Sequence, residues 1–327
     1  MSLSPGRRPR RGYAVAGTAR GFKVFVFAAG VFAAIVLMPL PALAFGPIAH
    51  IDMGLDVIAE AAGLGSGLWA VIQSHPREFL RGTLGPDREV AKNLATYDRH
   101  SHNWDRFFAR LEQATSDAQR SFFLGCLCHL AADVVAHNYF VPLKMIESHR
   151  ARFAGHLYWE MRFDARGREQ GSRQTMKALE LNTREHRKFL HSVVPGNILG
   201  PRFNVRVTGL AMRMQRAMAF QAVSGYVDRE SRLALSDVDA KEVRHLAVAA
   251  QGSLLRGLAR APIVAIDARG EESLAEARRL RRHLRDLVRR KGEPNPEAAS
   301  IVADSRTVFR DRLVAATGIP APCIHAA

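Results

Sequence analysis

The chain has 327 residues, with 47 lysines and arginines against 31 acidic residues, which gives a formal net charge of +16. This excess of positive charge favours anionic partners such as phospholipid head groups, cell-envelope polymers or nucleic acid. The three cysteines exclude a disulfide-stabilised scaffold, and the length suffices for one sizeable hydrophobic core or for a domain with an extension.

The first 44 residues have the pattern of a secretory signal peptide. Six basic residues and no acidic residue precede an apolar run over positions 24–40, and Ala42 and Ala44 then fit an Ala-x-Ala cleavage site. A membrane anchor is the alternative, but Gly30 and Pro39 interrupt a run that is barely long enough to span a bilayer. We therefore expect export to the periplasm or the exterior, with cleavage before Phe45.

The segment Phe122–Pro142, FFLGCLCHLAADVVAHNYFVP, combines an apolar helical pattern with three polar residues at four-residue spacing. His129, Asp133 and His137 advance by about 40° per step around a helix, so they share one face. Two imidazoles and a carboxylate on a buried face need a partner that offsets their desolvation. A divalent metal ion would be a partner for all three.

Further potential ligands lie on both sides of this helix. His156 and Glu160 form a second helical pair, while His50, Asp87 and His102 precede it. Each of these residues has an ordinary alternative as a surface residue, a turn former or an exposed helical pair worth a few tenths of a kcal/mol. Their joint occurrence in one part of the chain favours a metal site.

The rest of the chain remains helical in pattern and shows no β-alternation of useful length. A loop is predicted at Gly167–Gly171 and a break at Pro195–Pro201. We expect an all-α, multi-helix bundle with the metal site in its core, built from a catalytic domain at 45–200 and a C-terminal helical extension at 201–327 packed on it. The helices predicted after residue 164 cover positions 172–194, 207–223, 237–258, 271–290 and 294–315.

One of these helices carries eight basic residues at positions 278–291 around a stripe of leucine and valine. Such a helix could dock to an anionic membrane surface. The favoured alternative is a solvated basic face on a helix that packs through its leucine stripe.

The order of the candidate ligands resembles the zinc-dependent phospholipases C and the related single-strand-specific zinc nucleases. In that family an aromatic first residue, a His, a Pro-Asp turn, a His, a His-Asp-His helix and a His-x-x-x-Glu/Asp pair follow one another. The run from Gly125 to His137 is similar to the Gly-x-x-x-His-x-x-x-Asp-x-x-x-His run of the bacterial phospholipase C branch. His102 is preferred to His100 because it directly precedes Asn-Trp. The resemblance covers residues 45–164 and implies the ligands Phe45 (amine and carbonyl), His50, Asp87, His102, His129, Asp133, His137, His156 and Glu160.

Two positions depart from the family pattern. Phe45 replaces the usual Trp, which changes little because its implied ligands are backbone atoms. The step from Asp133 to His137 is shorter than in the best-known members.

The resemblance also implies a chemistry with up to three zinc ions. Asp133 would bridge two of them, and Asp87 would be either a ligand or the general base. Water activated by zinc would attack a phosphodiester, so the expected enzyme is a secreted phospholipase C acting on phospholipids at an anionic or zwitterionic membrane surface. The implied sets are His129, His102 and Asp87 for one ion, His50 and the Phe45 backbone for the second, and His137, His156 and Glu160 for the third.

Two alternatives belong to other classes of protein. A single-strand-specific zinc nuclease or nucleotidase would act on nucleic acid, although no exposed aromatic residues interleaved with basic ones are evident for base stacking. A non-catalytic envelope protein could retain the same scaffold. No feature of the sequence indicates a protein partner.

Overall fold

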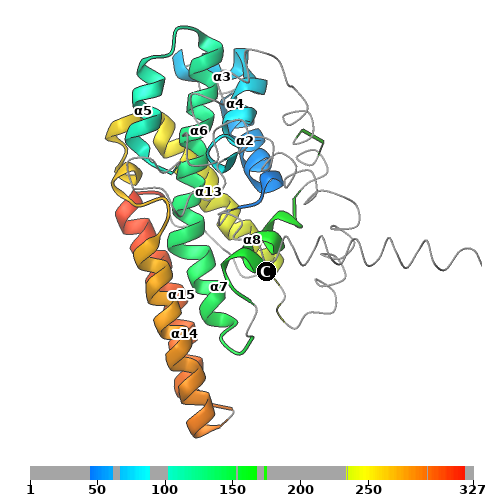
Figure 1. Ribbon diagram of the computed structural model, residues 1–327, viewed down its shortest axis with the longest axis vertical. Coiled ribbons are helices and arrows are strands. Elements are labelled where there is room, and N and C mark those ends of the chain that lie inside the picture. Colours follow the sequence, from blue (N-terminus) through cyan, green and yellow to red (C-terminus); the bar gives the residue numbers. More distant parts are fainter. Residues whose placement is uncertain are drawn as a thin grey trace, which may run out of the picture. The chain divides into compact units, whose positions relative to one another are not determined.

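The structure is a computed structural model that describes residues 45–61, 67–88, 102–151, 154–167, 173–174, 233, 235–292 and 294–320. These residues belong to one compact unit, Pro41–Ala327. Among them every regular element is a helix and none is a strand (Figure 1). The all-α prediction is therefore confirmed.

The helices form two groups along the sequence. The first group contains the predicted ligands and consists of α2 (Pro47–Ala61), α3 (Gly67–Ser74), α4 (Pro76–Gly82), the 3₁₀-helix η1 (Pro86–Arg88), α5 (Trp104–Glu112), α6 (Asp117–Val135), the π-helix η4 (Ala136–Phe140), α7 (Val141–Glu147) and α8 (His156–Asp164). The second group consists of α13 (Asp237–Gly257), the 3₁₀-helices η5 (Leu258–Arg260) and η6 (Pro262–Ala265), α14 (Glu271–Lys291) and α15 (Pro296–Thr317).

The core is built around α6. Every residue from Ser121 to Val135 is buried, and helices α4, α13, α5 and α3 pack against it. The continuous helical stretch Asp117–Glu147 is long and apolar enough to cross a membrane, but most of its apolar part is buried inside the protein. A helix that is hydrophobic on all sides is typical of a core position, so polar side chains on α6 point into the protein.

Helices α4 and α6 touch through two glycines. A Cβ atom on Gly82 would overlap the carbonyl oxygen of Phe122, and one on Gly125 would overlap that of Phe79. Only a residue without a Cβ atom permits this approach of two helix backbones. The contact holds η1, which follows α4 and carries Asp87, against α6.

The long core helix changes its hydrogen-bonding pattern where the third polar residue of the predicted triplet lies. Residues Ala136–Phe140 form the single π-helical segment η4 between α6 and α7. The regular α-helix predicted through Phe122–Pro142 is therefore interrupted, because a π-segment takes an additional residue per turn and turns the side chains that follow it. His137 lies in this segment, which is a common position for functional residues.

The C-terminal helices begin and end within two residues of the predicted ranges. Ser236 caps α13, since its Oγ accepts a hydrogen bond from the N–H of Asp239 at 3.0 Å. Helix α13 packs on α6 and α2, and α14 packs on α7. The second group of helices thus shares the core of the first group, while the boundaries of the two predicted domains stay a prediction.

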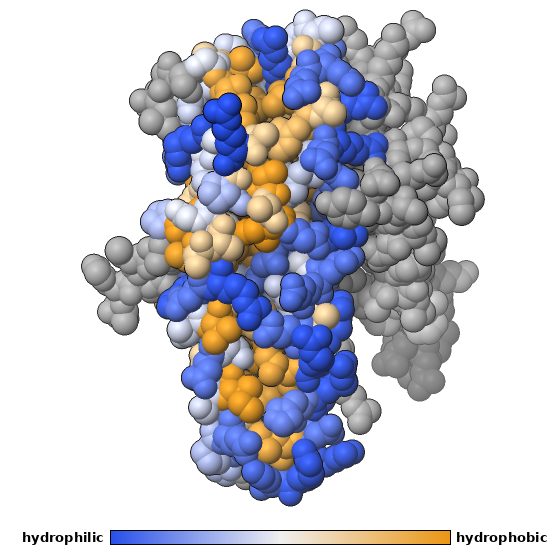
Figure 2. All heavy atoms as spheres, turned by 90° about the vertical axis from the view of Figure 1, so that its left-hand side faces the viewer, coloured by the Kyte–Doolittle hydropathy of each residue, from blue (hydrophilic) through white to orange (hydrophobic). Residues whose placement is uncertain are grey.

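Helix α14 is the basic helix, and it packs as the favoured interpretation predicts. Leu284 and Leu287 are buried, whereas Arg278 and Arg279 are exposed. In the lower half of Figure 2, where α14 and α15 lie, hydrophilic residues dominate and surround smaller apolar areas. Most basic residues of α14 therefore form a solvated face, whereas Arg281 is buried and donates a hydrogen bond to the carbonyl oxygen of Ala151.

Several predictions from the sequence lie outside the described residues and stay predictions. They are the signal peptide at 1–44, the alternative ligand His100, the loop at Gly167–Gly171 after its first residue, the break at Pro195–Pro201, the helix at 207–223 and almost all of the helix at 172–194.

Candidate metal centre

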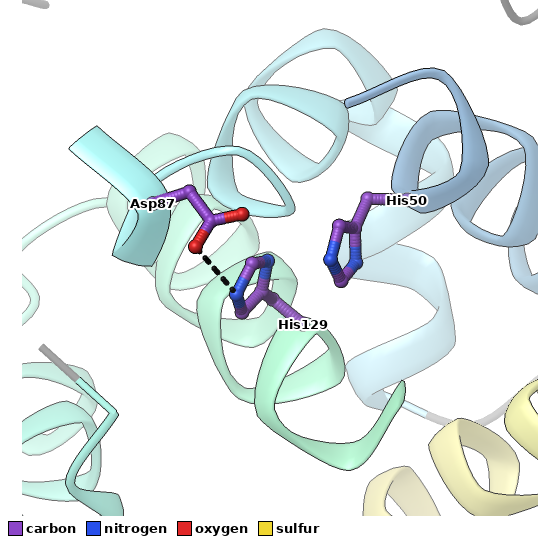
Figure 3. A group of neighbouring side chains, drawn as sticks. All are labelled: His50, Asp87 and His129. Atoms are coloured by element: carbon purple, nitrogen blue, oxygen red, sulfur yellow. Dashed lines mark ion pairs between the residues drawn. The ribbon is translucent and has the colours of Figure 1, made fainter. Parts of the chain in front are cut away.

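Four elements bring histidines and carboxylates to one buried point beside α6. His50 lies on α2, Asp87 in η1, His102 directly before the N-cap of α5, and His129 and Asp133 on α6. All five side chains are at most 3% exposed. Figure 3 shows His50, Asp87 and His129 converging from three different elements. The predicted ligands from position 50 to position 133 therefore come together, and we call them the Asp133 cluster.

The two oxygens of Asp133 face different imidazoles. Oδ1 lies 3.3 Å from His50 Nε2, while Oδ2 lies 2.9 Å from His102 Nε2 and 3.2 Å from His129 Nε2. Asp87 Oδ1 lies 3.5 Å from His102 Nε2 and 3.7 Å from His129 Nε2. A carboxylate whose oxygens serve two separate sets of ligands has the geometry of a bridge between two cations.

Ring nitrogens in the cluster also face one another. His102 Nε2 and His129 Nε2 are 3.3 Å apart, and the rings of His50 and His129 stack with centroids 3.9 Å apart. His129 Nδ1 lies 2.8 Å from the carbonyl oxygen of Thr83. Because a carbonyl only accepts, Nδ1 carries the proton there and Nε2 of the neutral ring presents its lone pair to the cluster.

Several buried polar atoms of the cluster are unsatisfied. Both ring nitrogens of His50 and both carboxylate oxygens of Asp133 lack a hydrogen bond of acceptable geometry within the described part of the chain. Leaving such a group unsatisfied costs roughly 1–3 kcal/mol, which a bound cation would offset. Imidazole and carboxylate donors without a thiolate are the ligands of catalytic zinc, so the residues present fit that metal.

The charges in the cluster suit a metal site. Burial raises the pKa of Asp133, but His129, His102 and His50 outweigh this effect and hold that pKa well below its usual range. Burial also lowers the pKa of His129, but Asp133 and Asp87 overcome this effect and raise it. Burial, reinforced by His129, lowers the pKa of His50. Asp133 is therefore ionised, and His50 favours the neutral form that can ligate a metal.

A second group of potential ligands joins η4 to α8. His156 Nε2 and Glu160 Oε1 are 2.6 Å apart on α8, and His137 Nε2 lies 3.8 Å from the same oxygen. The three ligand atoms all lie within 4.8 Å of one another. His137 Nε2 is buried and has no hydrogen bond to any described residue. The structure thus brings together the three residues that the resemblance assigns to a third zinc ion.

Phe45 lies beside the Asp133 cluster. It is completely buried, and its ring centroid is 5.8 Å from that of His50 in an edge-on contact and 4.6 Å from that of Phe163. The position is compatible with a first residue next to the metal, whereas the ligand role of its amine and carbonyl stays a prediction.

Sequence reasoning missed Asp164, the last residue of α8. Its Oδ1 accepts a hydrogen bond from the backbone N–H of Ala49 at 2.8 Å, and a Cβ atom on Gly46 would overlap its carboxyl group. The free N–H groups of the first turn of a helix need such a partner, and this turn carries His50. The position of Asp164 four residues after Glu160 places both carboxylates on one face of α8, a signal that the sequence already contained.

Burial raises the pKa of Asp164 to about 7, despite hydrogen bonds from Ala49 and Ile48 and with support from the charges of Asp52 and Glu160. The folded protein holds the Asp164 proton more tightly than the unfolded chain, in which the pKa is near 4, so protonation of Asp164 stabilises the fold. This contribution is complete below about pH 4 and is lost as the pH rises to about 7. The contribution is on the order of 4 kcal/mol.

We expect Asp164→Asn to remove this pH dependence, because the amide cannot ionise. The measurement compares the unfolding free energy of EDTA-treated wild type and variant between pH 4 and pH 8. The difference between the two proteins should change across this window. Parallel profiles would show that Asp164 does not titrate there.

The comparison with protein families agrees with this geometry. Residues 49–206 match the model of the zinc-dependent phospholipase C family, and this range contains every predicted ligand except Phe45. No curated protein and no solved structure matches the chain significantly. Residues 49–206, just under half of the chain, are therefore similar to the zinc-dependent phospholipase C family, and they contain a buried histidine and carboxylate cluster that fits zinc.

Proposed function

We propose that the protein is an exported phospholipase C that hydrolyses the phosphodiester bond between diacylglycerol and the phosphorylated head group of a phospholipid. The observation that carries the proposal is the buried Asp133 carboxylate. Its two oxygens lie 2.9–3.3 Å from three imidazole nitrogens, yet neither oxygen has a hydrogen bond of acceptable geometry to a described residue. The family match supports a zinc phosphodiesterase in general, and phospholipid is the substrate class that the family description implies.

Zinc bound by these residues would lower the pKa of water and neutralise charge on the phosphate oxygens. The chain itself holds the ligands in place. Thr83 fixes the orientation of His129, and Asp164 fixes the turn that carries His50. Asp87 is close enough to His102 and His129 to be a ligand, and as a buried carboxylate it is equally suited to accept a proton from the attacking water.

An assay with phospholipid vesicles tests this function. Mature protein loaded with zinc should release phosphorylated head group from phosphatidylcholine or phosphatidylglycerol vesicles, EDTA should stop the release, and added zinc should restore it. Single-stranded DNA serves as the second substrate in the same buffer. Cleavage of DNA alone, or turnover of neither substrate by metal-loaded protein, would contradict the proposal.

The proposed export adds a prediction about the first residue. The protein recovered from outside the cytoplasm should begin at Phe45, as N-terminal sequencing or intact mass would show. Since the resemblance implies that the Phe45 amine binds zinc, a protein that retains one extra residue before Phe45 should bind one zinc ion less tightly. Equal zinc affinities in the two proteins would mean that this amine is not a ligand.

A further inference from the structure

A loop outside the family-matching segment contacts the metal centre. In the loop Ile266–Gly270, which connects η6 to α14, three consecutive carbonyl groups face side chains near the ligands. The carbonyl of Ile266 accepts a hydrogen bond from Trp104 Nε1, and the carbonyl of Asp267 accepts one from Asn138 Nδ2, both at 3.0 Å. The carbonyl oxygen of Ala268 lies 2.6 Å from His137 Nδ1. Trp104 follows His102 by two residues, so the loop touches both ligand-bearing segments.

The third contact determines which nitrogen of His137 can bind a metal. The carbonyl oxygen of Ala268 can only accept a hydrogen bond, so His137 Nδ1 must carry the proton. In the neutral ring Nε2 then presents a lone pair toward Glu160 and His156. A hydrogen bond to the distal nitrogen of this kind fixes the tautomer and the ring orientation of metal-binding histidines.

The loop is shaped for this contact. Asp267 Oδ1 accepts a hydrogen bond from the N–H of Arg269 at 3.1 Å, and Oδ2 accepts one from the N–H of Glu271 at 3.2 Å. Gly270 has a φ of +55°, and a Cβ atom there would overlap the backbone carbonyl of His137. The positive φ and the close approach both require glycine, so the loop is held in contact with His137.

We propose that the loop Ile266–Gly270 is a positioning element of the metal centre, and that the C-terminal helices complete the zinc site formed by His137, His156 and Glu160. The inference rests on the zinc centre of the proposed function. It explains why a histidine in a π-helical segment, where the regular helical spacing is lost, still presents Nε2 to the two ligands on α8. It also predicts that residues 49–206 do not contain the whole site.

The test measures zinc affinity in the full mature protein by competition with a chromophoric chelator. Gly270→Ala should push the loop away from His137 and lower the affinity for one zinc ion by about 10–100-fold, the usual effect of losing a group that orients a ligand. The other zinc ions should keep their wild-type affinity. In a His137→Ala background, Gly270→Ala should cause no further loss, because the same zinc ion is already lost.

Gly318→Ala is the matched control. Gly318 also has a positive φ, +65°, and no heavy atom of the described residues would lie within 4 Å of a Cβ there. Its backbone strain is therefore similar, but zinc affinity should not change. Asp267→Ala is the second variant. It removes the two hydrogen bonds that shape the loop without adding an atom, and it should also lower the affinity for a single zinc ion.

The outcomes separate the proposals. If Gly270→Ala does not fold, Asp267→Ala decides: selective weakening of one zinc ion supports the inference, and loss of none or of all overturns it. A folded Gly270→Ala protein with wild-type affinity for every zinc ion would overturn it while the proposed function stands. Wild-type protein that binds no zinc would contradict both this inference and the proposed function. An ¹⁵N spectrum of the zinc-loaded protein should show His137 protonated at Nδ1 and metal-bound at Nε2, and the opposite pattern would contradict the inference.

Discussion

Asp133→Asn is expected to abolish phosphodiester hydrolysis and to lower the zinc content at the same time. The two oxygens of Asp133 face His50 on one side and His102 with His129 on the other. The amide keeps the shape but loses the charge and one of the two oxygens, so it can no longer bridge two cations. Activity should fall by more than the roughly 10–100-fold effect of losing a residue that merely orients a ligand. Elemental analysis and the vesicle assay measure the two effects.

Asp52→Asn is the matched control for this substitution. Asp52 is also a buried aspartate, and its Oδ2 lies 3.7 Å from Arg244 Nη1. It lies outside the Asp133 cluster, so zinc content and activity should be retained. A wild-type zinc content in Asp133→Asn would argue against the bridging role, and Asp133→Ala, which removes both oxygens, should then be measured in the same way.

Much of the metal centre could be predicted because its ligands are chemically rare in a buried setting. Imidazoles and carboxylates at four-residue spacing within an apolar helix indicate a shared partner, and the pattern holds for His129 with Asp133 and for His156 with Glu160. The helical class and the ends of the C-terminal helices followed from apolar periodicity and capping residues such as Ser236.

The contacts that orient the ligands could not be predicted in this way. The groups facing His129 and His137 are backbone carbonyls of Thr83 and Ala268, and every residue has such a group. Their selection depends on which loops the tertiary packing brings close. The π-segment η4 likewise has no simple sequence signal, because its residues fit an α-helix equally well.

Gly125→Ala should be strongly destabilising although it adds only one methyl group. The added Cβ would overlap the carbonyl oxygen of Phe79, so α4 and α6 would have to separate along the centre of the core. Overpacking of this kind costs about 1–3 kcal/mol and occasionally more, and a contact with rigid backbone belongs at the upper end. Chemical denaturation of the zinc-loaded protein measures the loss.

The same separation should reach the metal centre, because the chain after α4 carries Thr83, which orients His129, and Asp87. We therefore expect weaker zinc binding together with the lower stability. Gly67→Ala is the control, since Gly67 is likewise a helical glycine, the first residue of α3, and a Cβ there would have no heavy atom of the described residues within 4 Å. In a helix this change should be neutral or stabilising by roughly 0.5–1 kcal/mol. Equal denaturation midpoints for Gly125→Ala and Gly67→Ala would contradict the close contact between α4 and α6.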